Sequence, residues 1–222
     1  MTNAQEKIIS HALRMPLFSG ISETEIKKLL SEMGGKVVVC PEGQTLTVSG
    51  SHGSKKNLYM LISGIVQLVR YGEQGVCYLI DYTVPGGIID HTDIRDIRFQ
   101  NGVYVAGKDC VLLRMTLPEP RKDSSEALSK FERNLMNAAA DRNARLVQKV
   151  DIISRRTVRE KLLTFLRYES RRQRSSSFEI PLNRQELADY ICVDRTTLST
   201  ELGRLKNEGI IHNSRNYFEL IG

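Results

Sequence analysis

Short apolar runs separated by turn-forming residues fill the chain between about residues 36 and 115. The runs are rich in β-branched and aromatic residues, which favour strands, and the breaks between them contain Pro and Gly. Many short strands joined by regular turns are typical of a β-sandwich or roll. We therefore expect strands at 36–39, 58–62, 65–69 and 76–82, with turns at Pro41-Glu42-Gly43, Ser63-Gly64, 72–75 and Pro85-Gly86-Gly87.

A helix is expected just before this β-rich region. Ser22 and Glu25 are three residues apart, the spacing of a capping box at the start of a helix. Apolar residues then follow at helical intervals, so one face of this helix is expected to be buried. Its members are Ile26, Leu29, Leu30 and Met33.

A longer helical pattern follows Pro118 and Pro120 and continues to Ile153. Asp123 and Glu126 have the spacing of a capping box at its start. Apolar residues then recur at alternating intervals of three and four, the repeat by which two helices wrap around each other. The pattern predicts dimerisation, with a helix packed on its own domain as the alternative. The expected seam, which a charged residue interrupts, is Leu128, Phe131, Leu135, Ala138, Arg142, Leu146 and Val150.

The remaining third of the chain reads as alternating helices, loops and short strands. Ser154 is expected to cap a helix that runs to about Arg172, and the polar residues 173–177 form a loop. Residues 178–182 alternate like a short edge strand.

Residues 183–209 have the pattern of two helices joined by a tight turn. Asn183 is expected to cap the first helix with Glu186, and Asp194 to cap the second, after a turn at Cys192-Val193. Gly209 is expected to end the second helix. The expected buried positions of the pair are Leu187, Ala188, Ile191, Leu198, Leu202 and Leu205.

The exposed face of the second helix carries the side chains that a recognition helix uses in the major groove. Arg can contact guanine through two hydrogen bonds, and hydroxyls can contact bases or phosphates. Residues 210–221 follow as a hairpin with a basic tip, like a DNA-binding wing. Spacing alone leaves open a plain structural helix pair. The candidate DNA-binding residues are Arg195, Thr196, Thr197, Ser199, Thr200, Arg204 and Arg215.

Charge and length agree with a two-domain protein that binds a polyanion. The chain has 222 residues and a formal net charge of +6. Seven basic residues and two acids lie between Ser154 and Arg172, and clustered positive charge raises affinity for phosphates. No apolar run is long enough to cross a bilayer and no export signal is evident, so we expect a cytoplasmic protein without a membrane partner.

The four cysteines and four histidines are dispersed. Because the spacings of zinc and iron–sulfur ligands are missing, no metal site and no cofactor are predicted. A redox response of a single thiol, Cys77 or Cys110, is a hypothesis that requires a low thiol pKa and exposure.

Three segments resemble the Crp/Fnr family of bacterial transcription regulators. They are R-Q-E-L-A-D-Y-I-C-V-D-R-T-T-L-S-T-E-L-G-R-L-K-N-E-G-I-I from Arg184, L-Y-M-L-I-S-G-I-V from Leu58, and V-R-E-K-L from Val158. The resemblance implies an α+β protein with an N-terminal β jelly-roll sensor domain (1–120), a long dimerisation helix (121–153) and a C-terminal winged helix-turn-helix (154–222). It further implies a homodimer that binds an inverted-repeat operator in double-stranded DNA, and that contacts RNA polymerase if it is an activator.

Departures from the family concern the effector and the operator. Cyclic-AMP-binding members carry a Gly-Glu pair followed by an Arg-Ser/Thr-Ala run, whereas this chain has Gly86-Gly87-Ile88-Ile89-Asp90-His91 and Gln100-Asn101-Gly102. We therefore expect an effector other than cyclic AMP, whose identity is unknown. Thr196 and Thr200 stand where relatives often have Glu and Arg, so a non-standard half-site is expected. The candidate effector pocket is Tyr59, Leu61, Ile88, Arg142 and Arg145.

The pattern of residues does not favour an enzyme, since no nucleophile–base pair or phosphate-binding loop has diagnostic spacing. The alternative to a DNA-binding regulator is a ligand- or redox-sensing signalling module whose C-terminal half contacts protein.

Overall fold

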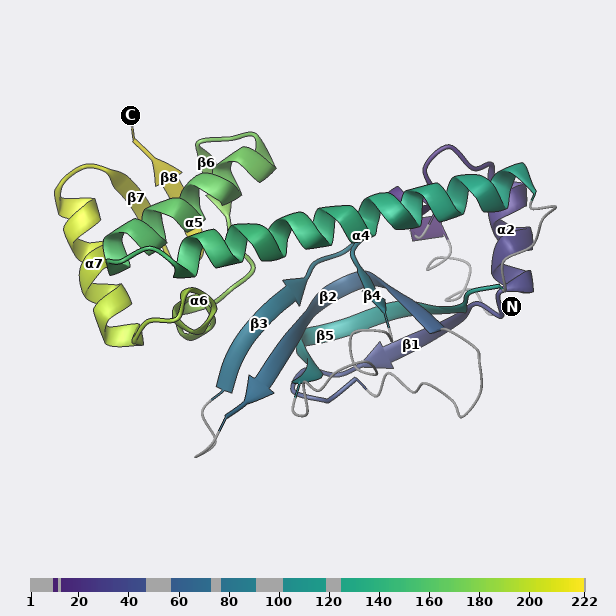
Figure 1. Cartoon of the computed structure of the whole chain (residues 1–222), viewed down its shortest axis with the longest axis horizontal. Helices are drawn as coiled ribbons and strands as arrows, with labels where there is room; N and C mark the ends of the chain where they lie inside the picture. Colours follow the sequence, from purple (N-terminus) through teal and green to yellow (C-terminus); the bar gives the residue numbers. More distant parts are fainter. Residues whose placement is uncertain are drawn as a thin grey trace. The chain divides into compact units, whose positions relative to one another are not determined.

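The computed structural model describes residues 10–11, 13–46, 57–72, 77–90, 102–118 and 125–221. Two compact units can be distinguished (Figure 1): Met1–Tyr71 with Asp81–Arg142, and Gly72–Ile80 with Asn143–Gly222. The division falls inside a long helix at Arg142 and inside a strand at Ile80, whereas the sequence placed its boundaries at residues 120 and 153.

The first unit is β-rich. Its helical elements are η1 (Pro16–Phe18), α2 (Glu23–Glu32) and the first half of α4 (Glu126–Ile153), and its strands are β1 (Lys36–Cys40), β2 (Asn57–Tyr71), β3 (Cys77–Thr83), β4 (Ile88–Asp90) and β5 (Gly102–Thr116). The strand order is β1-β5-β2-β3, and β4 pairs with β2. The predicted capping box of Ser22 and Glu25 is confirmed at the start of α2.

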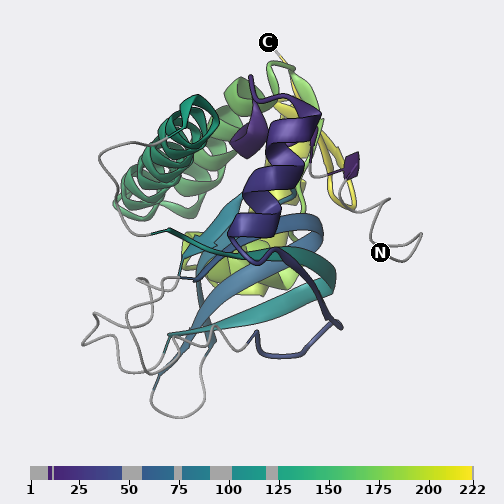
Figure 2. The ribbon, with the colours of Figure 1, turned by 90° about the vertical axis from the view of Figure 1, so that its right-hand side faces the viewer.

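Two hydrophobic clusters form the core of this unit. The first lies where α2, η1 and the start of α4 meet the sheet. These three helical elements lie beside one another in Figures 1 and 2. The centres of the Phe18 and Phe131 rings in this cluster are 5.8 Å apart. The second lies on the strands and contains Tyr59, Leu61 and Tyr104. Burial of large aromatic and aliphatic side chains in both clusters stabilises the unit.

The predicted turn at Ser63-Gly64 is wrong, because β2 runs through it as one strand. The pairing with β5 instead shifts register between Leu61 and Val66, as at a β-bulge. Gly64 has φ +92°, and a Cβ there would lie 2.3 Å from the carbonyl oxygen of Asp109. Glycine therefore signals a bulge within the strand here.

The second unit contains the end of α4, three further helices and a small sheet. Its elements are α5 (Val158–Gln173), β6 (Ser177–Glu179), α6 (Arg184–Ile191), α7 (Arg195–Asn207), β7 (Ile211–Ser214) and β8 (Tyr217–Leu220), with the strand order β6-β8-β7. The expected α+β fold class and C-terminal winged helix-turn-helix are confirmed. The expected edge strand at 178–182 is shorter, because β6 ends at Glu179.

The expectation that Ser154 caps α5 is wrong. Thr157 is the N-cap and forms a reciprocal capping box with Glu160, whereas the Ser154 hydroxyl donates to the Val150 carbonyl. The other expected box, at Asp123 and Glu126, lies partly outside the described residues, and the Leu128 N–H donates instead to the Ser125 hydroxyl oxygen.

Within the second unit, which includes the start of β3 up to Ile80, a buried lysine of α4 contacts both that strand and α6. The Lys149 ammonium donates to the carbonyls of Leu79 and Ile80 and lies 4.4 Å from the centre of the Tyr190 ring of α6. These contacts compensate the burial of its charge.

Candidate nucleic-acid interface

The helix-turn-helix begins at a capping box. Asn183 accepts a hydrogen bond from the Glu186 N–H at 3.0 Å, and the Glu186 carboxylate accepts one from the Asn183 N–H at 2.6 Å. Both orphan donors at the start of α6 are thus satisfied, as the sequence predicted.

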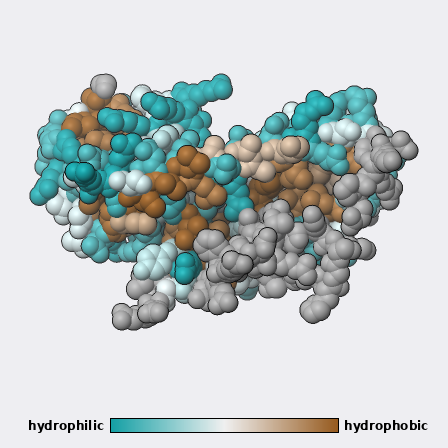
Figure 3. Space-filling model, in the orientation of Figure 1, coloured by the Kyte–Doolittle hydropathy of each residue, from teal (hydrophilic) through white to brown (hydrophobic). Residues whose placement is uncertain are grey.

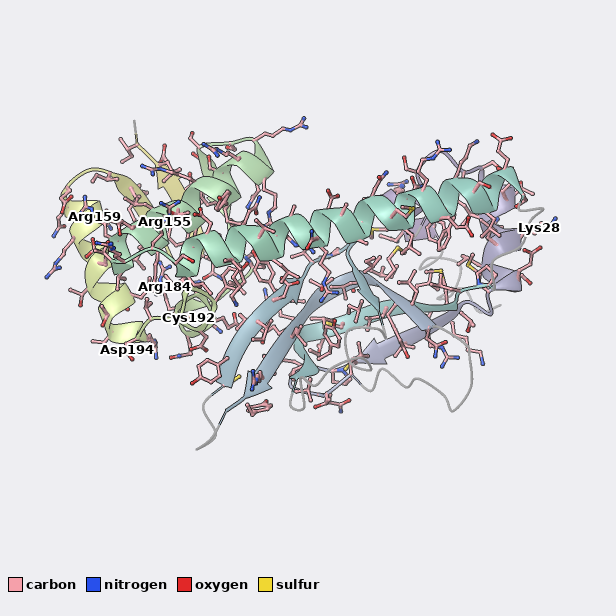
Figure 4. The ribbon with its side chains drawn as sticks, in the orientation of Figure 1. Lys28, Arg155, Arg159, Arg184, Cys192 and Asp194 are labelled. Atoms are coloured by element: carbon pink, nitrogen blue, oxygen red, sulfur yellow. The ribbon has the colours of Figure 1, made fainter. Side chains whose placement is uncertain are left out.

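The turn between α6 and α7 depends on a left-handed residue. Cys192 has φ +55°, a conformation that favours glycine, and the Val193 N–H donates to the Ala188 carbonyl at 3.0 Å. The Lys161 ammonium donates to the Cys192 carbonyl at 3.2 Å, which fixes the turn against α5. Asp194 occupies the N-cap position of α7 as predicted, but its side chain makes no capping hydrogen bond within the described residues. Figure 4 shows Cys192 and Asp194 at this turn.

The recognition-helix candidates lie on the exposed side of α7. The apolar stripe of Leu198, Leu202 and Leu205 is buried. The six candidates of this helix are exposed: Arg195, Thr196, Thr197, Ser199, Thr200 and Arg204. Arg204 lies 3.6 Å from Glu201, and the Thr200 hydroxyl donates to the Thr196 carbonyl at 3.0 Å.

The hairpin after α7 has the form of a wing. Strands β7 and β8 pair from Ile211 with Leu220 to Ser214 with Tyr217, and a two-residue turn joins them. Arg215 is exposed at that turn with φ +49°, so the predicted basic tip is confirmed.

A groove of about 750 Å³ joins the start of α6, the start of α7 and the wing. Three arginines from these elements line it, together with polar side chains. The lining residues are Glu179, Asn183, Arg184, Gln185, Arg195, Ser214, Arg215, Asn216 and Tyr217. Three guanidinium groups in one groove at two helix N-termini are well suited to an anion.

Arg184 is the groove residue that the sequence analysis missed. Its guanidinium carbon lies 5.0 Å from the centre of the Phe218 ring, and burial lowers its pKa. An arginine remains protonated in proteins, so the charge stays in the groove. Its position as the first residue of α6, next to a helix N-terminus, is the signal that could have identified it.

The chain is similar to a known domain family, to curated proteins and to solved structures. Residues 160–221 match the model of the Crp-like helix-turn-helix domain. The transcriptional activator protein FnrL of Cereibacter sphaeroides is 21% identical over 178 residues, which cover 76% of this chain and 69% of FnrL. The C-terminal part of the chain therefore resembles the helix-turn-helix domain of Crp-like regulators. The relatives found are transcription regulators rather than enzymes.

Solved structures share the fold of this chain. FixK2 from Bradyrhizobium japonicum has a TM-score of 0.62 and 16% identity, over 85% of this chain and 93% of that chain. A cyclic nucleotide-binding domain containing protein from Listeria monocytogenes has a TM-score of 0.67 and 13% identity, over 88% and 97% of the two chains.

Several basic residues are engaged in ion pairs around α5. Arg155 pairs with Asp151 at 2.6 Å, and Arg172 pairs with Glu169. Arg159, near α7 in Figure 4, contacts both Glu201 and Glu208, and its hydrogen bonds hold the pKa of Glu208 below its usual range. The basic run in the sequence therefore overstates the positive charge available to a partner.

The expected dimer seam is only partly exposed. Phe131 is 0% exposed within the first core cluster, and Leu128, Leu135 and Ala138 pack partly buried against it. Leu146 is half-buried, whereas Val150 is 59% exposed. Arg142, which interrupts the seam, is directed to its own unit, where it lies 3.4 Å from Asp81 and donates to the Tyr104 hydroxyl.

Among the candidate effector residues, Arg142 donates to the hydroxyl of Tyr104, which belongs to the same cluster as Tyr59 and Leu61. Tyr59 and Leu61 are buried in the second cluster of the first unit, whereas Ile88 belongs to the first cluster. Arg142 is paired with Asp81, and Arg145 is half-buried in the second unit.

The thiols do not have the environment of a reactive single cysteine. Burial raises the pKa of the Cys110 thiol. Cys77 is exposed as a residue, but partial desolvation of its thiol and the negative charge of Asp189 raise its pKa as well. A reactive thiol requires the opposite shift. Within the described residues, no group of three His, Cys, Asp or Glu could hold a metal ion. No described helix is long and apolar enough to span a membrane.

Proposed function

We propose that the chain is a Crp/Fnr-type regulator that binds double-stranded DNA as a homodimer and recognises an inverted repeat. The observation that carries the proposal is the groove in which Arg184, Arg195 and Arg215 meet. These residues come from α6, α7 and the wing. Arg184 and Arg215 can hold the phosphates of one DNA strand while α7, which begins at Arg195, lies in the major groove.

Sequence is read by the exposed N-terminal part of α7. Arg195 supplies a donor fork for guanine, and Thr196 and Thr200 supply hydroxyls and methyl groups in place of longer charged side chains. Thr197, Ser199 and Arg204 are exposed on the same helix and contribute contacts to the DNA backbone.

Dimerisation uses an exposed apolar face of α4 that shares only Val150 with the seam expected from the sequence. Met136, Val147 and Val150 are 73%, 62% and 59% exposed. They are eleven and three residues apart, intervals that place them on one face of a continuous helix. Figure 3 shows apolar surface along the middle of α4. Two such faces bury one another in a symmetric pair, which gives two recognition helices related by a two-fold axis.

The effector is proposed to be a molecule other than cyclic AMP. The stretch Gly86–Ile89 lacks both the acid and the arginine of the cyclic-AMP-binding members. Arg142, a candidate effector residue, is already paired with Asp81, so an anionic effector that bound it would have to compete with that carboxylate. If the regulator is an activator, the DNA-bound dimer also contacts RNA polymerase.

The test is the selection of genomic fragments by the purified protein, with Arg195→Ala and Arg184→Ala beside it. We expect one inverted-repeat motif for the natural protein. Arg195→Ala should cost about 1–3 kcal/mol of binding free energy and relax the preference at one position of each half-site. Arg184→Ala should weaken binding to all sequences and lower the slope of affinity against salt by about one.

The matched control is Arg167→Ala, which removes an exposed arginine of α5 outside the groove. Equal losses in all three variants would mean that only net charge matters. Unchanged binding in Arg195→Ala and Arg184→Ala would contradict the proposed interface, and no DNA recovery at low salt would favour a protein-contacting module.

A further inference from the structure

Two cysteines that are 70 residues apart in sequence lie directly opposite each other in the sheet of the first unit. The register of the antiparallel strands β1 and β5 pairs Cys40 with Cys110. Cys40 is 5% exposed and Cys110 is 0% exposed, and both belong to the same hydrophobic cluster. Opposed residues of an antiparallel pair have side chains on the same face of the sheet, so the two Cβ atoms are neighbours and a rotation of the side chains can bring the sulfurs together.

The spacing of such a pair is compatible with a disulfide. Opposed Cα atoms in antiparallel strands are about 4.5–5.5 Å apart, within the range of about 4.4–6.8 Å that disulfides span. Opposed Cβ atoms are about 4.5–5.5 Å apart and must approach by about 1 Å to reach the usual separation in a disulfide. The bond would therefore be strained and easily reduced, which suits a reversible modification rather than a permanent cross-link.

Both thiols make only weak contacts, with backbone carbonyl oxygens. The Cys110 thiol lies 2.9 Å from the Lys108 carbonyl oxygen and 3.1 Å from that of Ile65, and the Cys40 thiol lies 3.6 Å from the Gln44 carbonyl oxygen. Thiols are weak donors, so these contacts cost little to break. The bulge at Gly64 provides the space for one sulfur, because a Cβ at that position would lie 2.8 Å from Cys110 Sγ.

We propose that Cys40 and Cys110 are a modification site at which a two-electron oxidant such as hydrogen peroxide forms a reversible disulfide between β1 and β5. This goes beyond the proposed DNA binding and does not depend on it. Cys40 is the first to react, because it ends an edge strand and is followed by the turn at Pro41-Glu42-Gly43. Edge strands open more readily than central ones.

The reaction is balanced with one peroxide. The Cys40 thiolate attacks one peroxide oxygen, the O–O bond breaks, and water and a sulfenic acid result. The Cys110 sulfur then attacks the Cys40 sulfur, the S–O bond breaks, the S–S bond forms and a second water leaves. The two sulfurs lose two electrons and the peroxide gains them. Burial raises the pKa of both thiols, so the closed sheet reacts slowly and local opening of β1 sets the rate.

The experiment treats the full-length protein with increasing hydrogen peroxide, blocks the remaining thiols and maps tryptic peptides. A disulfide links peptide 37–55 to peptide 109–114 with the loss of two hydrogens, and dithiothreitol releases it. We expect this linked pair in most chains, together with a higher urea midpoint of unfolding in the oxidised protein. Both effects should be absent in Cys40→Ala and Cys110→Ala and retained in Cys77→Ser, which removes an exposed thiol.

The mapping of the natural protein decides the matter even if a core variant fails to fold. Oxidation confined to Cys77 and Cys192, with Cys40 and Cys110 recovered as blocked free thiols after denaturation, would overturn the proposal. Linkage of Cys40 or Cys110 only to Cys77 or Cys192 would overturn it as well.

Discussion

Glu201 is a carboxylate buried in the recognition helix, where a negative charge is unexpected. Its side chain is 10% exposed and lies 3.5 Å from Arg159 of α5 and 3.6 Å from Arg204. Arg159 also pairs with Glu208 at the end of α7. These contacts neutralise two acids close to the DNA-binding surface and hold α7 against α5.

Replacing Arg159 by Gln is therefore expected to lower the free energy of unfolding of the second unit, because Glu201 loses a charged partner while it remains buried. Urea unfolding measures the effect. Arg156→Gln, an exposed arginine in the preceding turn, is the matched control and should change the free energy of unfolding by less than about 0.5 kcal/mol. Equal effects of the two variants would show that the contact with Glu201 contributes nothing specific.

Helix α4 has two apolar faces with different environments. One packs on the core of its own unit through Phe131, and the other leaves Val147 and Val150 exposed. A charge at Val150 would be placed opposite its own copy in a symmetric dimer, with repulsion and desolvation acting together.

We expect Val150→Glu to convert the dimer to a monomer, measured by sedimentation velocity, and to weaken binding to an inverted repeat much more than to a single half-site. Val39→Glu is the control, since Val39 is an exposed valine of β1. If Val150→Glu remains dimeric, the interface lies elsewhere.

The sequence predicted the elements whose signals are local. The capping boxes at Ser22 and Asn183 and the stripe at Leu198, Leu202 and Leu205 were all confirmed. The misses involve competition between similar signals. Ser154 and Thr157 are both good caps, and only Thr157 has Glu160 three residues later.

Only those parts of the candidate nucleic-acid interface that depend on local signals could be predicted from the sequence. Exposed residues of α7 follow from helical period, but the groove depends on α6, α7 and the wing folding together, so Arg184 could not be recognised from spacing alone. The pairing of Cys40 with Cys110 likewise follows from strand register over 70 residues, which the pattern of apolar residues does not determine.

Several carboxylates spread over the molecule have lowered pKa values. Hydrogen bonds to Ser22, Thr157 and Arg159 lower the pKa of Glu25, Glu160 and Glu208 below the ordinary value of 4.5. A carboxylate whose folded pKa is depressed stabilises the protein above its unfolded pKa, and this stability is lost as the pH falls through the folded pKa.

The free energy of unfolding should therefore be flat near neutrality and decline as the pH falls below about 4.5. Urea unfolding at a series of pH values measures the decline. Glu208→Gln removes one of the titrating groups and should make the decline of the free energy of unfolding with pH shallower. Glu132→Gln serves as the control, since Glu132 is an exposed acid of α4. An identical slope in both variants would show that Glu208 does not contribute.

The internal pairing of Arg155, Arg159 and Arg172 bears on how the regulator travels along a chromosome. Each arginine bound to a carboxylate of its own chain releases no counterions from DNA, so random stretches of the genome hold the protein less firmly. Short residence on these stretches leaves more free dimers and shortens the search for the operator. The acids around α5 thus lower the affinity for non-specific DNA and speed the exchange of the protein between DNA sites.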